Sequence, residues 1–241
     1  MPNAEPCIRE PSLTFHVGVT GARVLGADAI SALRVQLAAL LERVKNHVEI
    51  LRNGSWATQR VASRLPSQPR APLVVMVSPL AEGADRLAAA QALALGYELE
   101  APLPFAQAEY EKDFPGSVDE FRSLLAQAGP RVLELEAARI GDGAYNYEAV
   151  GQLVVRHSDL LIAIWDGDKS RGRGGTAEIV QYAAGRGQPI WWLRADGRGD
   201  ACWIESLDDL RHHRTCACGD VACARLEAFI RHWLPHSTEV H

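Results

Sequence analysis

A glycine-rich loop between an apolar run and a helix is the part of this sequence with the clearest chemistry. Residues 160–165 are continuously apolar, and Asp166 and Gly167 follow them directly. Gly174, Gly175 and Thr176 then come at the start of a predicted helix. Free N–H groups at a helix start, which glycine lets a ligand approach closely, bind anions, and phosphate is their usual occupant. The pattern predicts a site for a phosphorylated ligand.

Charged residues surround this predicted anion site. Lys169, Arg171 and Arg173 lie in the loop, and Glu178 lies in the first helical turn. We expect Arg173 to assist the phosphate site and Glu178 to hydrogen-bond a ribose hydroxyl or water. A tight strand-to-helix turn with a solvated basic loop is the alternative interpretation, because one glycine-rich loop is a weak signal.

Small and polar residues also follow two other predicted strands, at residues 13–19 and 73–77. They are Thr20, Gly21 and Arg23 after the first strand, and Ser78, Gly83 and Asp85 after the second. Open α/β sheets bind ligands outside the carboxyl ends of their strands, so we expect these residues to line the same site. Ordinary strand-to-helix turns, with Asp85 stabilising a helix start, explain them equally well.

Tyr110 and Tyr147 are candidates for contact with a base. Residues 105–114 read as a short helix over the sheet, and Tyr147 lies at the start of the helix that leads to the central strand. A charged surface helix and ordinary packing are the competing explanations.

Strands and helices alternate along the chain. This order predicts an α/β, Rossmann-like three-layer fold with a mostly parallel sheet and helices on both faces. A periodic apolar pattern predicts a long helix through residue 51, and Gly54, Pro66 and Pro69 predict a loop over residues 53–72. The last strand is expected at residues 188–193.

The composition limits the class of protein. The chain has 241 residues, 47% of them hydrophobic, and a net charge of -5. This length suits one sizeable domain with a small appendage. The sequence has no membrane-spanning run and no signal-peptide pattern, so a cytoplasmic protein is expected. The acidic balance argues against nucleic acid as a partner.

Cysteines and histidines gather in the last part of the chain. Cys202, Cys216, Cys218 and Cys223 lie near His212, but their spacing matches no common zinc site. Free thiols are therefore the preferred interpretation over a metal, and no cofactor is predicted.

Four motifs taken together resemble the SLOG superfamily, which unites the DNA-processing protein DprA with the LOG proteins. They are GVTGAR at 18–23, SPLAEGADRLAAAQALALG at 78–96, LPFAQAEYEKDF at 103–114, and RHSDLLIAIWDG with RGRGGTAE at 156–178. The resemblance covers residues 12–194, which we take as the nucleotide-binding domain, and leaves residues 195–241 as an extension packed on it. It implies a nucleotide or nucleotide-derived ligand.

The superfamily offers three functions: LOG-like hydrolysis of nucleoside monophosphates, DprA-like binding of single-stranded DNA, and non-catalytic sensing of a nucleotide signal. The LOG catalytic arginine and glutamate fall here at Ala149 and Ile179. Glu178 is one residue early, which turns a helical side chain by about 100°. Glu178 remains the catalytic candidate if the chain is an enzyme, but we favour binding of a small-molecule nucleotide. Analogy with LOG proteins suggests a homodimer.

Overall fold

A computed structural model describes residues 14–59, 74–135, 138–139, 141–168, 174–212 and 217–233. Eight strands form one sheet in the order β4-β3-β2-β1-β5-β6-β7-β8. Their bounds are β1 Phe15–Gly21, β2 Val74–Val77, β3 Glu98–Leu103, β4 Val132–Glu134, β5 Leu160–Trp165, β6 Ile190–Arg194, β7 Cys202–Ile204 and β8 Ala217–Cys218. Strands β1 to β6 are parallel, and β7 and β8 add two antiparallel pairings. The sheet is mostly parallel, as predicted.

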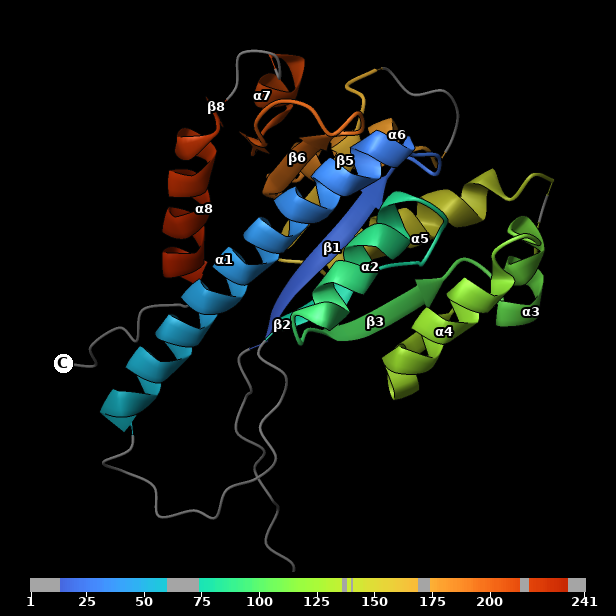
Figure 1. Ribbon diagram of the computed structural model, residues 1–241, viewed down its shortest axis with the longest axis horizontal. Helices are drawn as coiled ribbons and strands as arrows, with labels where there is room; N and C mark the ends of the chain where they lie inside the picture. Colours follow the sequence, from blue (N-terminus) through green and yellow to red (C-terminus); the bar gives the residue numbers. More distant parts are fainter. Residues whose placement is uncertain are drawn as a thin grey trace, which may run out of the picture.

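Helices cover both faces of this sheet (Figure 1). The α-helices are α1 Ala27–Gln59, α2 Ala84–Ala94, α3 Gln107–Tyr110, α4 Val118–Ala128, α5 Ala144–Arg156, α6 Thr176–Gly185, α7 Leu207–Arg211 and α8 Asp220–Trp233. Short 3₁₀ turns lie at Glu111–Asp113 and Gly129–Arg131. Helices α1, α2, α4 and α8 bury their apolar residues in the core on one face, and α5 and α6 bury theirs on the other. The three-layer α/β prediction is confirmed.

The order of the strands reverses direction between β1 and β5. From β1 the chain builds outward through β2, β3 and β4, and it then returns to place β5 against the other side of β1. Such a reversal separates the loops that leave the two strands and opens a crevice at their carboxyl ends. The fold therefore places its natural ligand position beside Gly21 and Trp165, the last residues of β1 and β5.

Helix α1 is longer than the sequence predicts. It continues through Asn53, Gly54 and Ser55 to Gln59, where a loop was expected. Propagating an existing helix adds one hydrogen bond for each residue fixed, so a single weak helix former such as glycine need not end it. Residues 60–72 of the predicted loop lie outside the described residues.

The strand predicted to be the last, β6, is followed by two more strands. Strand β6 is followed by β7 and β8, so part of the cysteine-bearing tail joins the same sheet. Helix α8 lies beside α1, and Arg43 of α1 forms an ion pair with Glu227 of α8 at 2.6 Å. The tail is therefore integrated into the sheet and into the helices that cover it.

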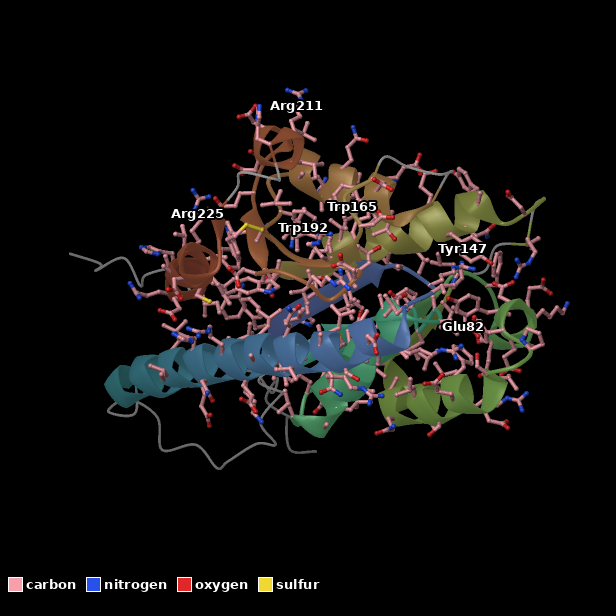
Figure 2. All side chains as sticks on the ribbon, turned by 45° about the horizontal axis from the view of Figure 1, so that its top comes forward. Glu82, Tyr147, Trp165, Trp192, Arg211 and Arg225 are labelled. Carbon is pink, nitrogen blue, oxygen red and sulfur yellow. A yellow bond between two sulfur atoms is a disulfide. The ribbon has the colours of Figure 1, made fainter. Side chains whose placement is uncertain are left out.

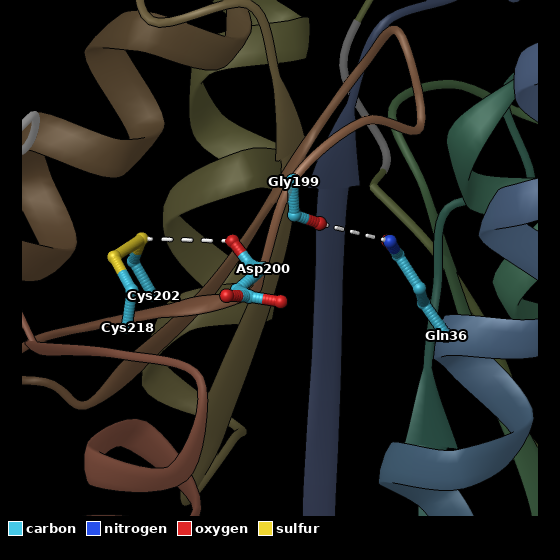
Figure 3. The surroundings of a disulfide bond; sticks show 5 residues. All are labelled: Gln36, Gly199, Asp200, Cys202 and Cys218. Carbon is cyan, nitrogen blue, oxygen red and sulfur yellow. Dashed lines mark hydrogen bonds between the residues drawn. A yellow bond between two sulfur atoms is a disulfide. The ribbon is translucent and has the colours of Figure 1, made fainter.

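A disulfide corrects the expectation of free thiols. Cys202 and Cys218 are directly opposite each other on β7 and β8, and their sulfur atoms are bonded (Figure 3). The adjacent turn is held to α1, because the Gln36 side-chain amide donates to the Gly199 carbonyl at 3.2 Å. Cys223 keeps a free thiol, and Cys216 lies outside the described residues. The sequence alone could not show the pairing because it depends on the register of β8.

Within the described residues, no helix is both long enough and apolar enough to cross a membrane.

A substitution at Gly21 tests how tightly the carboxyl end of β1 is packed against its neighbours. A Cβ at this position would lie 2.4 Å from the Ala84 Cβ and 2.7 Å from the Ile164 carbonyl oxygen. We expect Gly21→Ala to lower the free energy of unfolding by about 1–3 kcal/mol, because neither neighbour can move away freely. Urea denaturation measures the change. Gly26→Ala is the matched control, since a Cβ there has no atom within 4 Å, and an equal loss in both variants would contradict the packing argument.

Candidate functional site

A cleft of about 650 Å³ opens at the carboxyl ends of β1 and β5. Its walls come from the ends of these two strands, the starts of α2, α5 and α6, and the end of α3. Figure 2 labels two of its lining residues, Tyr147 on α5 and Trp165 at the end of β5. The cleft lies at the reversal of strand order.

Ten of the predicted ligand-binding residues line this cleft. They are Thr20, Gly21, Arg23, Asp85, Tyr110, Tyr147, Asp166, Gly174, Gly175 and Thr176. Segments up to 156 residues apart in the sequence, from Thr20 to Thr176, thus meet at one place. Ser78, Gly83, Gly167 and Glu178 are not among the lining residues, and Arg173 lies outside the described residues.

Ser78 and Gly83 shape the loop that carries Pro79 and Ala81 into the cleft. Ser78 is fully buried, and its hydroxyl donates to the Asp85 carbonyl at 3.2 Å and accepts from the Leu80 amide at 3.2 Å. Gly83 has a φ of 80°, and a Cβ there would lie 2.4 Å from the Ala22 and Arg23 carbonyl oxygens. Both residues are therefore engaged by the protein itself.

The start of α6 forms the side of the cleft predicted to bind phosphate. Helix geometry leaves the amides of Thr176 and Ala177 without partners in their own helix, and both residues line the cleft. Glu178 bends back, and its carboxylate accepts from the Gly174 amide at 2.6 Å. The Glu178 carboxylate thus pairs with the Gly174 amide and does not take the amides of Thr176 and Ala177.

Arg23 lies at the mouth of the cleft. Its guanidinium is 4.8 Å from the centre of the Tyr147 ring, and the residue is exposed. Within the described part of the chain, Arg23 makes no hydrogen bond and no ion pair. A cation held over an aromatic face and otherwise unpaired can bind an incoming anion.

A polar network fixes the orientation of Tyr147. Its hydroxyl hydrogen-bonds with the Asp113 carboxylate and accepts from Arg139 at 3.1 Å. Arg139 also forms ion pairs with Glu109 and Asp113, each at 2.8 Å. Burial and the Asp113 contact raise the pKa of Tyr147. Because its hydroxyl is engaged, Tyr147 offers its ring to a ligand.

Asp85 is the buried acid of the cleft, with 6% of its surface exposed. Burial raises its pKa from 3.8 to about 7, although the Ala81 amide and the guanidiniums of Arg23 and Arg86 lower it. Desolvation disfavours the charged form of a carboxyl group, which explains the direction. Burial therefore favours the protonated form of Asp85 up to a higher pH than for an exposed carboxyl group.

Sequence reasoning missed the apolar wall of the cleft. Val150, Gly151 and Val154 of α5 and Ile179 of α6 line it. A Cβ at Gly151 would lie 2.5 Å from the Ile179 Cδ1, so this glycine lets the two helices approach closely. A glycine in the middle of a predicted helix was the available signal.

Arg86 was also missed, although it is only 3% exposed. Its Nε donates to the Leu80 carbonyl at 3.0 Å, and another nitrogen donates to Ser117 and pairs with Glu120. Its guanidinium also lies 4.5 Å from the Phe114 ring centre. Arg86 thereby ties the loop behind the cleft, where Leu80 has a φ of 59°, to the start of α4.

No protein-family model and no curated protein matches this sequence. Similar solved structures include two of DNA processing protein A, each 17% identical to this chain. The Streptococcus pneumoniae protein has a TM-score of 0.48, with 83% of this chain and 56% of that chain covered. For the Helicobacter pylori protein the TM-score is 0.46, with 91% and 80% covered. This chain thus spans little more than half the length of the pneumococcal protein.

The expectation drawn from charge against nucleic acid as a partner is corrected by this comparison. The Helicobacter pylori protein is described as binding single-stranded DNA. A net charge of -5 sums over the whole chain and does not fix the potential at one cleft, where Arg23 is exposed. Charge balance therefore does not exclude a nucleic-acid partner.

The raised pKa of Asp85 has a measurable effect on stability. Because the folded pKa of about 7 exceeds the ordinary value of 3.8, ionised Asp85 opposes folding, and this loss of stability grows as pH rises from about 4 to 7. We expect Asp85→Asn to raise the free energy of unfolding by up to about 4 kcal/mol at pH 8 and by less at pH 5. Urea denaturation at both pH values measures this.

Asp119→Asn, at an exposed position on α4, serves as the control for removing one carboxylate. It should leave the pH dependence of stability as in the wild-type protein. If Asp85→Asn had the same effect at pH 5 and pH 8, the buried carboxyl would not be titrating in this range.

Proposed function

We propose that this chain binds a nucleotide or nucleotide-derived ligand in the cleft and acts as a ligand-binding or sensor protein of SLOG-like type. The observation that carries the proposal is that the exposed Arg23, which makes no hydrogen bond or ion pair within the described residues, lines the same cleft as Thr176 and Ala177 at the start of α6. A phosphate fits between a guanidinium and a helix start, since both stabilise an anion. The proposal includes the division of the chain into a nucleotide-binding domain at residues 12–194 and an extension at residues 195–241 that packs on it.

The other walls suit the rest of a nucleotide. The ring of Tyr147 and the side chains of Val150, Val154 and Ile179 offer flat and apolar surface for a base. The basic residues Lys169, Arg171 and Arg173, between β5 and α6, lie outside the described residues. The cleft of about 650 Å³ lies within the range of small-molecule sites.

A pair of variants tests the phosphate position. We expect Arg23→Met to weaken binding of nucleoside 5′-monophosphates by about tenfold to a hundredfold, because a charged hydrogen bond contributes about 1.5–3 kcal/mol. Thr176→Ala should weaken binding less, by about 0.5–1.5 kcal/mol. Isothermal titration calorimetry gives both values. Arg34→Met, exposed on α1, is the control, and unchanged affinity in both test variants would exclude this pose.

Cleavage of the N-glycosidic bond is the alternative function. It needs a carboxylate directed at the sugar, and the Glu178 carboxylate instead accepts from the Gly174 amide. We therefore expect no free base when the protein is incubated with each nucleoside 5′-monophosphate and with NAD, followed by chromatography. Base release that disappears in Glu178→Gln would make the protein a hydrolase.

Single-stranded DNA is a second candidate ligand. The exposed side chains of Arg23, in the cleft lining, and Tyr145, at the start of α5, favour it. Tyr145, in the first turn of α5, is 66% exposed, and Val24 beside Arg23 is 89% exposed. Exposed rings and guanidiniums near one another can stack with successive bases. Competition between an oligonucleotide and a mononucleotide for the protein would show that both use this cleft.

A further inference from the structure

Two buried polar side chains of the cleft, Asp85 and Tyr110, have no side-chain partner among the described residues. Asp85, at the start of α2, is 6% exposed, and Tyr110, at the end of α3, is 1% exposed. Both line the cleft. In the part of the chain that the structure describes, no side chain hydrogen-bonds to either one. Asp85 accepts a hydrogen bond from the Ala81 backbone amide, which leaves other acceptor positions of its carboxyl group and the Tyr110 hydroxyl available for a ligand.

Tyr110 is held by aromatic packing and lines the cleft. The ring packs edge-on against Phe114 and Phe121, with centroids 4.9 and 5.6 Å away. The charged or ionisable groups that act on the hydroxyl are Asp85, Arg23, Tyr147 and Asp113, and the first three line the cleft. Burial, followed by the Asp85 charge, raises the pKa of Tyr110, so the hydroxyl keeps its proton and can donate a hydrogen bond.

The chemistry of this pair opposes phosphate. Asp85 supplies carboxyl oxygens that accept hydrogen bonds and, when ionised, repel an anion. The charged groups facing it are Arg23 at the mouth and Arg86, whose hydrogen bonds go to Leu80, Ser117 and Glu120. An N–H donor is the partner that a buried carboxyl group best accepts from, and an adjacent acceptor would meet the Tyr110 hydroxyl.

We propose that Asp85 and Tyr110 form a subsite that recognises the amino-bearing edge of a nucleobase. This inference rests on the proposed function and names its ligand class: nucleotides of adenine, guanine or cytosine, which carry an exocyclic amino group. Asp85 accepts from the amino group, and Tyr110 donates to the neighbouring ring nitrogen or carbonyl oxygen. The phosphate then lies toward Arg23 and the start of α6.

The burial of Asp85 supports this assignment. Keeping this carboxyl group buried costs folding free energy, because the Ala81 amide and the nearby guanidiniums do not fully offset the desolvation that raises its pKa to about 7. If position 85 served only to support the fold, a neutral side chain could serve there without this desolvation cost. Ligand N–H donors would offset part of the cost, and this makes the site selective against bases that lack the amino group.

Calorimetric titration with matched nucleotides tests the subsite. AMP and GMP are compared with IMP, and CMP with UMP, because IMP and UMP lack the amino group. We expect at least one amino-bearing nucleotide to bind about tenfold or more tightly than its counterpart, and Asp85→Asn and Tyr110→Phe to reduce that ratio toward one. Asp119→Asn is the control and should keep the ratio.

The outcomes separate this inference from the proposed function. If no nucleotide binds to the wild-type protein, the proposed function fails and the subsite fails with it. If nucleotides bind with equal affinity whether or not they carry the amino group, or if both variants keep the preference, the subsite alone is overturned. Thermal unfolding of each variant confirms that the change lies in recognition and not in folding.

Discussion

The close approach of three backbones at Gly21 is the constraint on which the cleft depends. The Ala22 amide donates to the Ile164 carbonyl at 2.9 Å, and the Ala84 amide donates to the Ala22 carbonyl at 3.0 Å. These two bonds fix the end of β1 against β5 and against the start of α2. A side chain at position 21 would separate them. Asp85 and Trp165 face one cleft because the strands and helix that carry them are joined here.

The two charged neighbours Asp85 and Arg86 show how the fold divides structural from binding roles. Arg86 donates hydrogen bonds to Leu80, Ser117 and Glu120, and its guanidinium packs on the Phe114 ring. Asp85, one residue earlier and on the cleft side, receives no such set of side-chain partners. Both are nearly fully buried, so exposure does not distinguish them. The hydrogen-bond partners of their side chains distinguish them. The same criterion separates Ser78, whose hydroxyl is bonded within its own loop, from Tyr110.

Much of the architecture could be predicted from sequence because it depends on local patterns. The apolar run before Asp166 gave the central strand, and small residues after strands marked the correct edge of the sheet. Features that depend on pairing between distant segments could not be predicted. The Cys202–Cys218 bond requires the register of β7 and β8, and the apolar wall requires α5 to lie against α6. Val150 and Val154 read in sequence as ordinary core residues, because packing and ligand contact use the same side chains.

Glu178 illustrates how a motif and a site can share residues without sharing chemistry. The sequence places this carboxylate one position from where a LOG-like catalyst needs it, and the structure shows it bonded to the Gly174 amide. A carboxylate in the first turn of a helix is stabilised by the helix dipole, and here it also closes the glycine-rich turn. Such a group holds the loop in place for the amides of Thr176 and Ala177. The arrangement stabilises an anion-binding backbone, and it directs no carboxylate from this helix at a sugar carbon.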